Sequence, residues 1–325
     1  MDNNYFMGLD GFVWFTGVVE DRNDPSQLGR VKVRCLGFHT DNKDDIPTKD
    51  LPWAHVMHPV TDPSMQGMGS SPSFLLEGSW VVGFFRDSRE KQQPVIMGTL
   101  PGYPQEVADT TKGFNDPNGT YPSSEITHSE HSTNESDVNR LARNETDKAH
   151  SVVATKNDSI TEDVPIANVD TTWTEPSSAY AATYPKNHVF ESESGHIKEI
   201  DDTTDNERIH EYHTAGTFYE IDKDGNKSTR VVGSNYEVVA GSNYVNVKGD
   251  VNLTIDTNCN TYIKGDWNIQ VDGSKTEVVT GAVSETYKDT KTENVTGAVS
   301  ESYGSTQTTA VSSNLTVTAS KIDLN

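Results

Sequence analysis

Acidic side chains are the most frequent titratable groups in this sequence, with 49 Asp and Glu among 325 residues. Two carboxyl groups held at a fixed separation, one of them protected so that its pKa is raised, can hydrolyse glycosidic bonds. Between residues 110 and 186 the carboxylates available for such a pair are Glu125, Glu130, Glu135, Asp137, Glu145 and Asp147. Polar residues surround them, and the few aliphatic residues nearby cannot form a core to hold the pair. We therefore predict no catalytic residue in this stretch.

Histidine pairs are the second pattern that could do chemistry. His128 and His131 are three positions apart, and so are His210 and His213. Residues i and i+3 of a strand point to opposite faces, so neither pair would bind one metal ion from a strand. We expect His210 and His213 to pack or to form hydrogen bonds, and we predict neither a metal nor a cofactor.

Two cysteines, Cys35 and Cys259, lie far apart in the sequence. A disulfide framework is therefore not expected, and we predict two buried thiols. The first fifteen residues lack a basic region and a sustained apolar core, and no apolar run reaches 18 residues. The sequence predicts neither a signal peptide nor a membrane-spanning helix, and we expect the protein to be made in a cytoplasm and to reach its destination by assembly.

The element that organises the last third of the chain is a glycine repeat with a period of eight residues. Val, Ile, Thr, Tyr and Asn dominate the repeat, and these residues favour strands. An even period keeps every octad in phase with the two-residue alternation of a strand, and glycine gives the backbone freedom to bend once per octad. We predict octad turns at Gly225, Gly233, Gly241, Gly249, Gly265, Gly273, Gly281 and Gly297. Thr257, Asp289 and Ser305 occupy the positions that lack glycine.

We call the glycine position of each octad the beat. One apolar residue per octad lies two positions before it. A solenoid normally buries several side chains per coil, so one residue is too few for the core of a single chain. Three chains wound together as a triangular prism, each contributing one residue per level, solve this problem. About twelve levels spaced ~4.8 Å apart give a rod on the order of 55–60 Å long. The predicted axis residues are Val231, Val239, Val247, Ile255, Ile263, Val271, Val279, Val295 and Val311, with Tyr287 and Tyr303 at equivalent positions.

Charge excludes some partners of such a homotrimer. The formal net charge is −23 per chain, and a trimer would carry three times that value. Nucleic acid and anionic membrane surfaces would repel it, so we predict no nucleic-acid partner. Five glutamates lie four residues after a beat, where they would line a hydrated channel or a solvated corner, and periodicity leaves that choice open: Glu237, Glu277, Glu285, Glu293 and Glu301.

Composition divides the chain into four segments. Their strand patterns predict an all-β protein. Residues 1–109 contain five short strand patterns punctuated by turn residues, which indicates a small barrel of the OB type. Such barrels often bind oligonucleotides or sugars, but no aromatic and basic face is evident here, so we predict protein docking. Residues 110–186 are a polar extended connector with one short helical turn near residues 137–144. Residues 187–224 are a further β segment, which the resemblance described below implies is the base of a needle, and residues 225–325 are the octad repeat.

Three stretches resemble the central tail spikes of T-even contractile phages, a family often called tail lysozymes and related to type VI secretion spikes. GVVEDRNDPSQLGRVKVRCLGFHT, IPTKDLPWAHVMHPVT and VIMGTLPG are similar to the N-terminal barrel of that family. Residues 173–225 are similar to the segment that opens its trimeric β-helix, and the octads match its Val-x-Gly repeat. The resemblance implies that the barrel docks on a ring-shaped hub trimer, that the helix forms a needle, and that a PAAR-type protein caps the tip.

The sequence departs from this family in one respect. T-even spikes carry a lysozyme domain between barrel and needle, and the connector here is about half as long as such a domain requires. The motif GHIKEIDDT contains Gly195, His196 and the acidic residues 199–202, but it lies in the segment that resembles the needle base. We therefore predict that the chain is not an enzyme and that a separate tail protein degrades the cell wall.

The C-terminal end of the octads predicts a capped tip. Some short phage spikes hold iron there through paired histidines, whereas NLTVTASKIDLN contains none. One inward histidine per chain would create a threefold site elsewhere on the axis. Ile322 and Leu324 would leave an apolar end on the trimer, and exposed strand ends associate readily, so we expect a separate tip protein to bind there.

Together these features predict a structural spike in the virion tail baseplate that pierces the host envelope when the sheath contracts. Two alternatives stay open: a spike with a cryptic peptidoglycan hydrolase, and a trimeric receptor-binding tail fibre. The resemblance favours a phage over a type VI apparatus or an extracellular injection device.

Overall fold

The computed structural model describes residues 12–70, 72–119, 135–146 and 163–322. The chain consists of two units, Met1–Asn258 and Cys259–Asn325. The described residues form strands, turns and two 3-10 turns, which confirms the predicted all-β class. Among them, no helix has the length and apolar character needed to cross a membrane.

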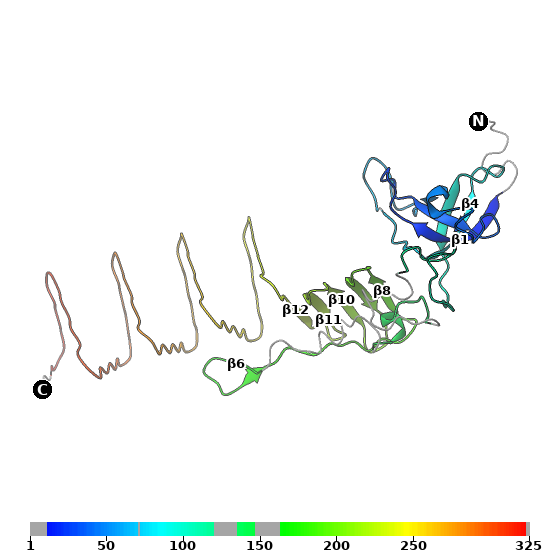
Figure 1. Ribbon diagram of the computed structural model, residues 1–325. Helices are drawn as coiled ribbons and strands as arrows, with labels where there is room; N and C mark the ends of the chain where they lie inside the picture. Colours follow the sequence, from blue (N-terminus) through cyan, green and yellow to red (C-terminus); the bar gives the residue numbers. More distant parts are fainter. Residues whose placement is uncertain (1–11, 71, 120–134, 147–162, 323–325) are drawn as a thin grey trace. The chain divides into compact units, whose positions relative to one another are not determined.

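The N-terminal part of the first unit is a closed barrel (Figure 1). Its strands are β1 (Val13–Asp21), β2 (Val31–Cys35), β3 (Trp53–Val56), β4 (Trp80–Phe85) and β5 (Pro94–Thr99). They follow the order β1-β2-β3-β5-β4, in which β3 and β5 are parallel and the other neighbours antiparallel. Closure leaves no free sheet edge in this element. The predicted five-stranded barrel is therefore confirmed.

The barrel core is apolar, with a buried ion pair beside it. The core cluster is Phe15, Val19, Val31, Val33, Cys35, Ala54, Leu75, Val81, Phe85 and Ile96. Next to it, Arg34 Nε donates to Glu20 Oε1 at 2.6 Å, and both side chains are fully buried. Arg34 also donates to the carbonyl oxygens of Thr40 and Ile46, which ties the loop after β2 to the barrel wall.

Gly113 brings a distant segment against this ion pair. The Phe114 amide donates to Glu20 Oε1 at 3.0 Å, although 94 residues separate the two in sequence. A Cβ at position 113 would lie 2.5 Å from Arg34 Cδ, so no larger residue fits without displacing the guanidinium. The start of the predicted connector is thus fastened to the barrel.

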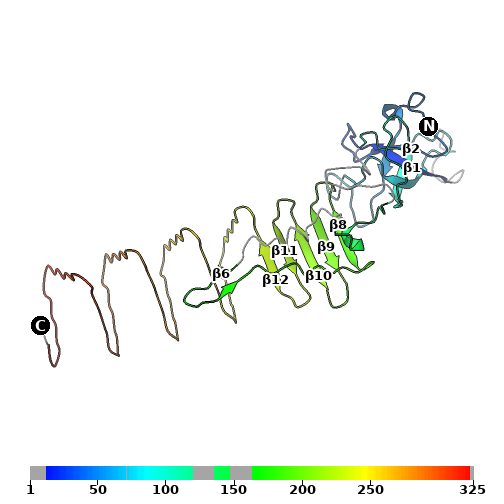
Figure 2. The same ribbon diagram turned by 60° about the horizontal axis from the view of Figure 1, so that its bottom comes forward.

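A five-stranded antiparallel meander follows the connector (Figures 1 and 2). Its strands, in spatial as well as chain order, are β8 (Asn187–Glu191), β9 (Ile197–Asp201), β10 (Arg208–Tyr212), β11 (Phe218–Ile221) and β12 (Lys227–Arg230). Burial alternates strictly along β9 and β10, as expected for a sheet with one covered face. A separate two-stranded hairpin pairs β6 (Val164–Pro165) with β7 (Thr172–Trp173).

Connector residues cover one face of this sheet. The 3-10 turn η3 (Leu141–Arg143) lies within the range expected for a helical turn, and Leu141 is 1% exposed. It forms a small core with Ile197, Tyr212 and Phe218. Ser136 and Asn139 accept hydrogen bonds from backbone amides at the start of this turn. The second 3-10 turn, η2 (Thr48–Asp50), lies in the barrel loop between β2 and β3.

Between residues 231 and 322 the octads contain no strand within a single chain. From residue 231 to residue 322 the backbone bends at every eighth residue, on the beat position and the residue before it, including the beats without glycine. The regular bends are visible in Figure 2. Gly225 differs from the other beats because it lies in the β11–β12 turn with φ of 79°. The predicted segment boundary at residue 224 consequently falls inside the sheet.

Candidate functional site

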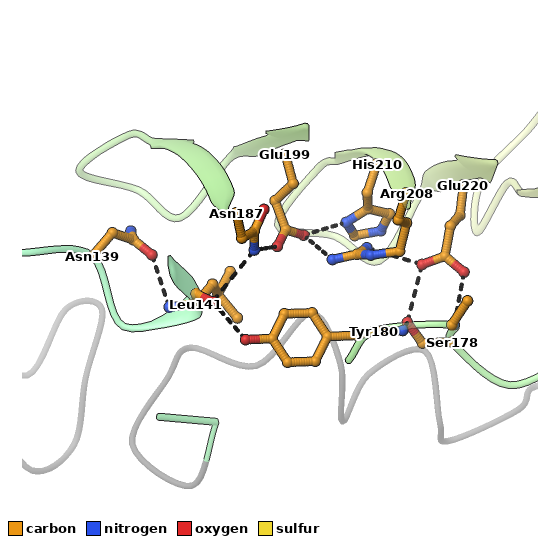
Figure 3. A network of polar contacts seen from close by, with 10 residues as sticks. Asn139, Leu141, Ser178, Tyr180, Asn187, Glu199, Arg208, His210 and Glu220 are labelled. Carbon is orange, nitrogen blue, oxygen red and sulfur yellow. Dashed lines mark hydrogen bonds and ion pairs between the residues drawn. The ribbon is translucent and has the colours of Figure 1, made fainter. Parts of the chain in front are cut away.

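The covered face of the meander carries a buried polar network, shown in Figure 3. Arg208 lies between two carboxylates, donating to Glu199 Oε2 at 2.7 Å and to Glu220 Oε2 at 2.9 Å. His210 Nδ1 lies 2.9 Å from the same Glu199 oxygen. All four side chains are almost completely buried. Strand pairing places Glu199, His210 and Glu220 in one row across β9, β10 and β11.

This network binds the connector to the sheet. Ser178 Oγ and the Ala179 amide donate to the two oxygens of Glu220, at 3.0 and 3.1 Å. The Tyr180 hydroxyl and Asn187 Nδ2 both donate to the Leu141 carbonyl oxygen, at 2.6 and 3.3 Å. Two connector segments that are distant in sequence are therefore held on one sheet face by shared buried acceptors.

The electrostatics of the network favour ionised carboxylates. Burial by itself would raise the pKa of Glu199, but hydrogen bonds from His210 and Asn187 and the Arg208 charge outweigh it, so the pKa lies below its ordinary value. The ionised Glu199 therefore stabilises the fold above the unfolded-state pKa of about 4.3, and this stabilisation is lost as the pH falls below that value. Burial raises the pKa of Tyr180, which keeps its hydroxyl protonated as a donor.

The geometry suits structural support rather than catalysis. His210 Nε2 is buried and has no hydrogen-bond partner among the described residues, so no nucleophile is positioned against it. A second constellation in the β3–β4 loop contains His58, Asp62 and Ser64, but the serine and the aspartate both contact the same ring nitrogen, Nδ1. A relay through an imidazole needs its two different nitrogens. Within the described residues no three His, Cys, Asp or Glu side chains form a metal cluster.

Each of the three described connector carboxylates weighed for catalysis has a partner of its own. Glu135 is paired with Arg140 and Arg143, and the hydrogen bond from Arg140 lowers its pKa despite partial burial. Asp137 accepts from the Gly102 amide at 2.7 Å. Glu145 lies 3.9 Å from Arg143. The other five residues considered in the connector lie outside the described residues: Glu125, Glu130, Asp147, His128 and His131.

His210 and His213 do not act as a pair. His210 joins the buried network, while the exposed His213 packs against His196 with ring centroids 4.5 Å apart and the ring planes tilted by 47°. The prediction of two buried thiols is wrong for Cys259, which is exposed in the single chain, whereas Cys35 is buried in the barrel. The polar residues around Cys259 provide no single-chain core into which a thiol could pack.

The octads present a second candidate functional surface, formed by the residues two positions before each beat. These side chains, from Val231 to Val311, are 38–55% exposed. Every other large apolar side chain between residues 236 and 317 is 62–92% exposed. The eight-residue period thus creates one consistently more sheltered apolar face, which we name the octad face. Ile322 is 54% exposed, and Leu324 lies outside the described residues.

The octad glycines have open surroundings. A Cβ added at Gly233, Gly241 or any later octad glycine up to Gly297 would meet no atom of the same chain within 4 Å. None of these glycines has a left-handed φ. Within one chain, therefore, neither backbone conformation nor packing requires glycine at these beats, in contrast to Gly113.

Sequence reasoning missed the buried ion pairs. It placed Glu199 only within the motif GHIKEIDDT and assigned no role to Arg208, Glu220, Glu20 or Arg34. A signal was present, because these charges alternate with residues of the opposite face and share the parity of Ile197, Tyr212 and Phe218. A search for opposite charges on neighbouring strands, at positions that alternate in phase with the core residues, would have identified the network.

Comparison with known proteins places this architecture in a family. The model of the Gp5 N-terminal OB domain matches residues 37–214, more than half of the chain. Protein Gp5 of Vibrio phage KVP40 is 42% identical over 286 residues, which cover 79% of this chain and 66% of that protein. The pre-baseplate central spike protein Gp5 of Enterobacteria phage T4 is 43% identical over 114 residues, 34% of this chain and 20% of that protein.

The aligned part of the chain thus covers just under two thirds of the length of the KVP40 relative and a fifth of the length of the T4 protein. The matched family model describes a domain of the same kind as the closed barrel, and the two relatives share the Gp5 name. The chain belongs to the Gp5 family of central spike proteins of T4-like phage baseplates.

Proposed function

We propose that this protein is the central spike of a contractile-tail baseplate and that it acts as a homotrimer. The observation that carries the proposal is the octad face, a single apolar row repeated at every level and left half-exposed by one chain. Three chains wound around a common axis bury this row, because each contributes one residue per level. The glycine beats then lie where a neighbouring chain approaches closely, which explains why glycine recurs at these positions although nothing inside one chain requires it.

The trimer transmits force. Sheath contraction drives the needle into the host envelope, and a prism whose strands are hydrogen-bonded to neighbouring chains resists bending and stretching. The barrel fastens the spike to a hub trimer in the baseplate. The buried network keeps the connector on the needle base while that load passes through it, since its donors and acceptors are withheld from water.

The tip binds a separate capping protein of the PAAR type. Ile322 is half-exposed at the end of the described octads, and three copies of this residue would form a small apolar surface on the trimer. A cap covers that surface together with the unpaired strand ends.

The spike itself does no hydrolysis. The hydrogen bond from Arg140 holds the pKa of Glu135 below its ordinary value, which does not suit a general acid, and Asp137 accepts a hydrogen bond from the Gly102 amide. We expect the purified full chain to leave a suspension of peptidoglycan turbid under conditions in which a lysozyme control clears it. Clearing that persists after repeated purification would establish a hydrolase in this chain.

An image of the whole tail tests the proposed role. In cryo-electron micrographs of tails labelled with an antibody against the barrel, we expect one trimer on the tail axis, within the baseplate. Six trimers at the baseplate periphery would instead establish a receptor-binding fibre, and the absence of label from intact tails would remove the protein from the particle. Tails from an amber mutant of this gene product provide the matched control for antibody specificity.

A further inference from the structure

The outer side of barrel strands β2 and β3 gathers cationic side chains around one indole. Lys32 pairs with Trp53 across the two strands, and both point away from the barrel interior, because their neighbours along the chain are core residues. Lys32 Nζ lies 5.0 Å from the centre of the Trp53 ring, and Arg30 Cζ lies 5.6 Å from it. His55 follows on the same side of β3 and is exposed.

Arg86 brings a further cation to this side from the end of β4. Its Nη2 donates to Gln93 Oε1 at 3.1 Å, just before β5 begins, and β5 runs beside β3 with Val95 paired to His55. Burial lowers the pKa of His55, and the charges of Arg86 and Arg30 lower it further. These side chains come from three strands, which is why no basic and aromatic face was evident from the sequence. Together they form what we name the cationic face: Arg30, Lys32, Trp53, His55 and Arg86.

Two carboxylates lie beside this face. Asp24 binds Arg30 through both of its oxygens, at 2.8 and 2.9 Å, and its charge acts on His55 in the opposite sense to the guanidinium groups. Asp87 follows Arg86 and accepts the backbone amides of two glutamines, residues 92 and 93. The three permanent cations of the face therefore outnumber the carboxylates next to them.

Lys32 accounts for the excess positive charge. Its side chain is buried, and its ammonium donates to the Lys49 carbonyl oxygen, a neutral acceptor. A carbonyl leaves the full charge of the ammonium in place, and screening by water is weak at a buried site. The cationic face thus presents a local positive potential in a chain whose net charge is −23.

The arrangement favours a ligand that is recognised by charge rather than by stacking. Small barrels of this kind bind oligonucleotides and sugars largely by stacking rings on aromatic side chains. Here the Trp53 indole is half-buried and already engaged by two cations of its own barrel. A long polyanion would also be repelled by the acidic remainder of the chain, whereas a short acidic segment senses charges only within a Debye length of ~8 Å.

We propose that the cationic face binds a short acidic segment of a protein partner, whose carboxylates lie between His55, Arg30 and Arg86. The bound carboxylate supplies the missing counter-charge, and the imidazole then takes up a proton and donates a hydrogen bond to it. The inference rests on the docking role that the proposed function gives to the barrel, and it depends on neither the trimer nor the needle.

Titration of the full chain with a fluorescein-labelled hexaglutamate peptide tests the proposal. At low ionic strength we expect saturable binding by fluorescence anisotropy, and no binding of a hexaglutamine peptide with the same label. His55→Glu should weaken binding of hexaglutamate about tenfold, because it places a like charge at the centre of the face, and His55→Lys should strengthen it. The matched control is His188→Glu, the same substitution at an exposed histidine of β8, which should change the affinity less than about twofold.

Chemical modification of the wild-type chain gives a local measurement. Diethyl pyrocarbonate acylates neutral imidazole, and mass spectrometry of digests follows its reaction with each histidine across a range of pH. In the free protein the lowered pKa of His55 keeps its imidazole neutral and reactive at a lower pH than that of an ordinary histidine. Saturating hexaglutamate should shift the reactivity profile of His55 to higher pH, because a nearby anion favours the protonated ring, and should leave that of His188 unchanged.

The outcomes separate this inference from the proposed function. Binding that His55→Glu weakens and His188→Glu spares, together with the shift at His55, supports the cationic face. Absence of hexaglutamate binding, or equal affinities in the two glutamate variants, overturns it. Tighter, His55-dependent binding of an oligothymidylate would also overturn it, because the ligand would then be nucleic acid. A failure of the spike role would instead appear in the tail micrographs, as label away from the tail axis.

Discussion

Val247→Asp is expected to abolish the heat- and detergent-resistant trimer. On the octad face, the substitution would bring three carboxylates together at one level of the shared axis. Burying each charge costs several kcal/mol unless it is protonated or hydrated, and the three also repel one another. The measurement is the fraction of trimer that survives on unheated denaturing gels, with the mass of the native protein determined by light scattering.

The matched control for this prediction is Val238→Asp. Val238 is 92% exposed and lies off the octad face, whereas Val247 is 52% exposed and lies on it. The same substitution at position 238 should therefore leave the trimer intact. If Val247→Asp retained a resistant trimer, the three-chain prism would be ruled out, and equal losses in both variants would show that any added charge in the octads is harmful.

Arg208→Leu is expected to destabilise the needle base by about 3–5 kcal/mol, because it leaves the carboxylates of Glu199 and Glu220 buried without their shared cation. Urea unfolding of the full chain, followed by tryptophan fluorescence, would measure the loss. Release of the connector should also make residues 175–183 more sensitive to a protease.

Lys223→Leu provides the control, since Lys223 forms an exposed ion pair with Asp224 in the β11–β12 turn. Exposed pairs of this kind contribute roughly 0–1 kcal/mol, so the unfolding midpoint should change little. A loss in Arg208→Leu no larger than in Lys223→Leu would show that the network does not hold the connector. Arg208→Lys should recover only part of the stability, because an ammonium cannot reach both carboxylates in the planar geometry of a guanidinium.

The two ends of the chain differ in how much of their structure was predictable. Turn residues between short β-rich stretches were sufficient to predict five strands in the barrel, since strand patterns and turn chemistry are local properties. The pairing order of those strands and the parallel contact of β3 with β5 depend on closure of the sheet. The bends of the octads were likewise predictable from spacing, because a repeat of eight keeps its phase with the strand period.

The candidate site was much harder to predict from the sequence than the barrel or the octads. The separation between residues 141 and 187, or between residues 178 and 220, is too large for any spacing rule to reveal that they share hydrogen bonds. The polar composition of residues 110–186 predicted no independent core, and a segment without its own core can still pack on another. Leu141 is buried against the meander for that reason.

By itself, the sequence determined the all-β class, the barrel, and the octad period with one apolar residue per turn, because these depend on the order of neighbouring residues. Only the tertiary structure decided which charges are buried and which face of the meander the connector covers. Those properties arise when residues far apart in the chain compete for one sheet surface, and the desolvation of Glu199, Arg208 and Glu220 is then repaid only by partners that the fold brings to them.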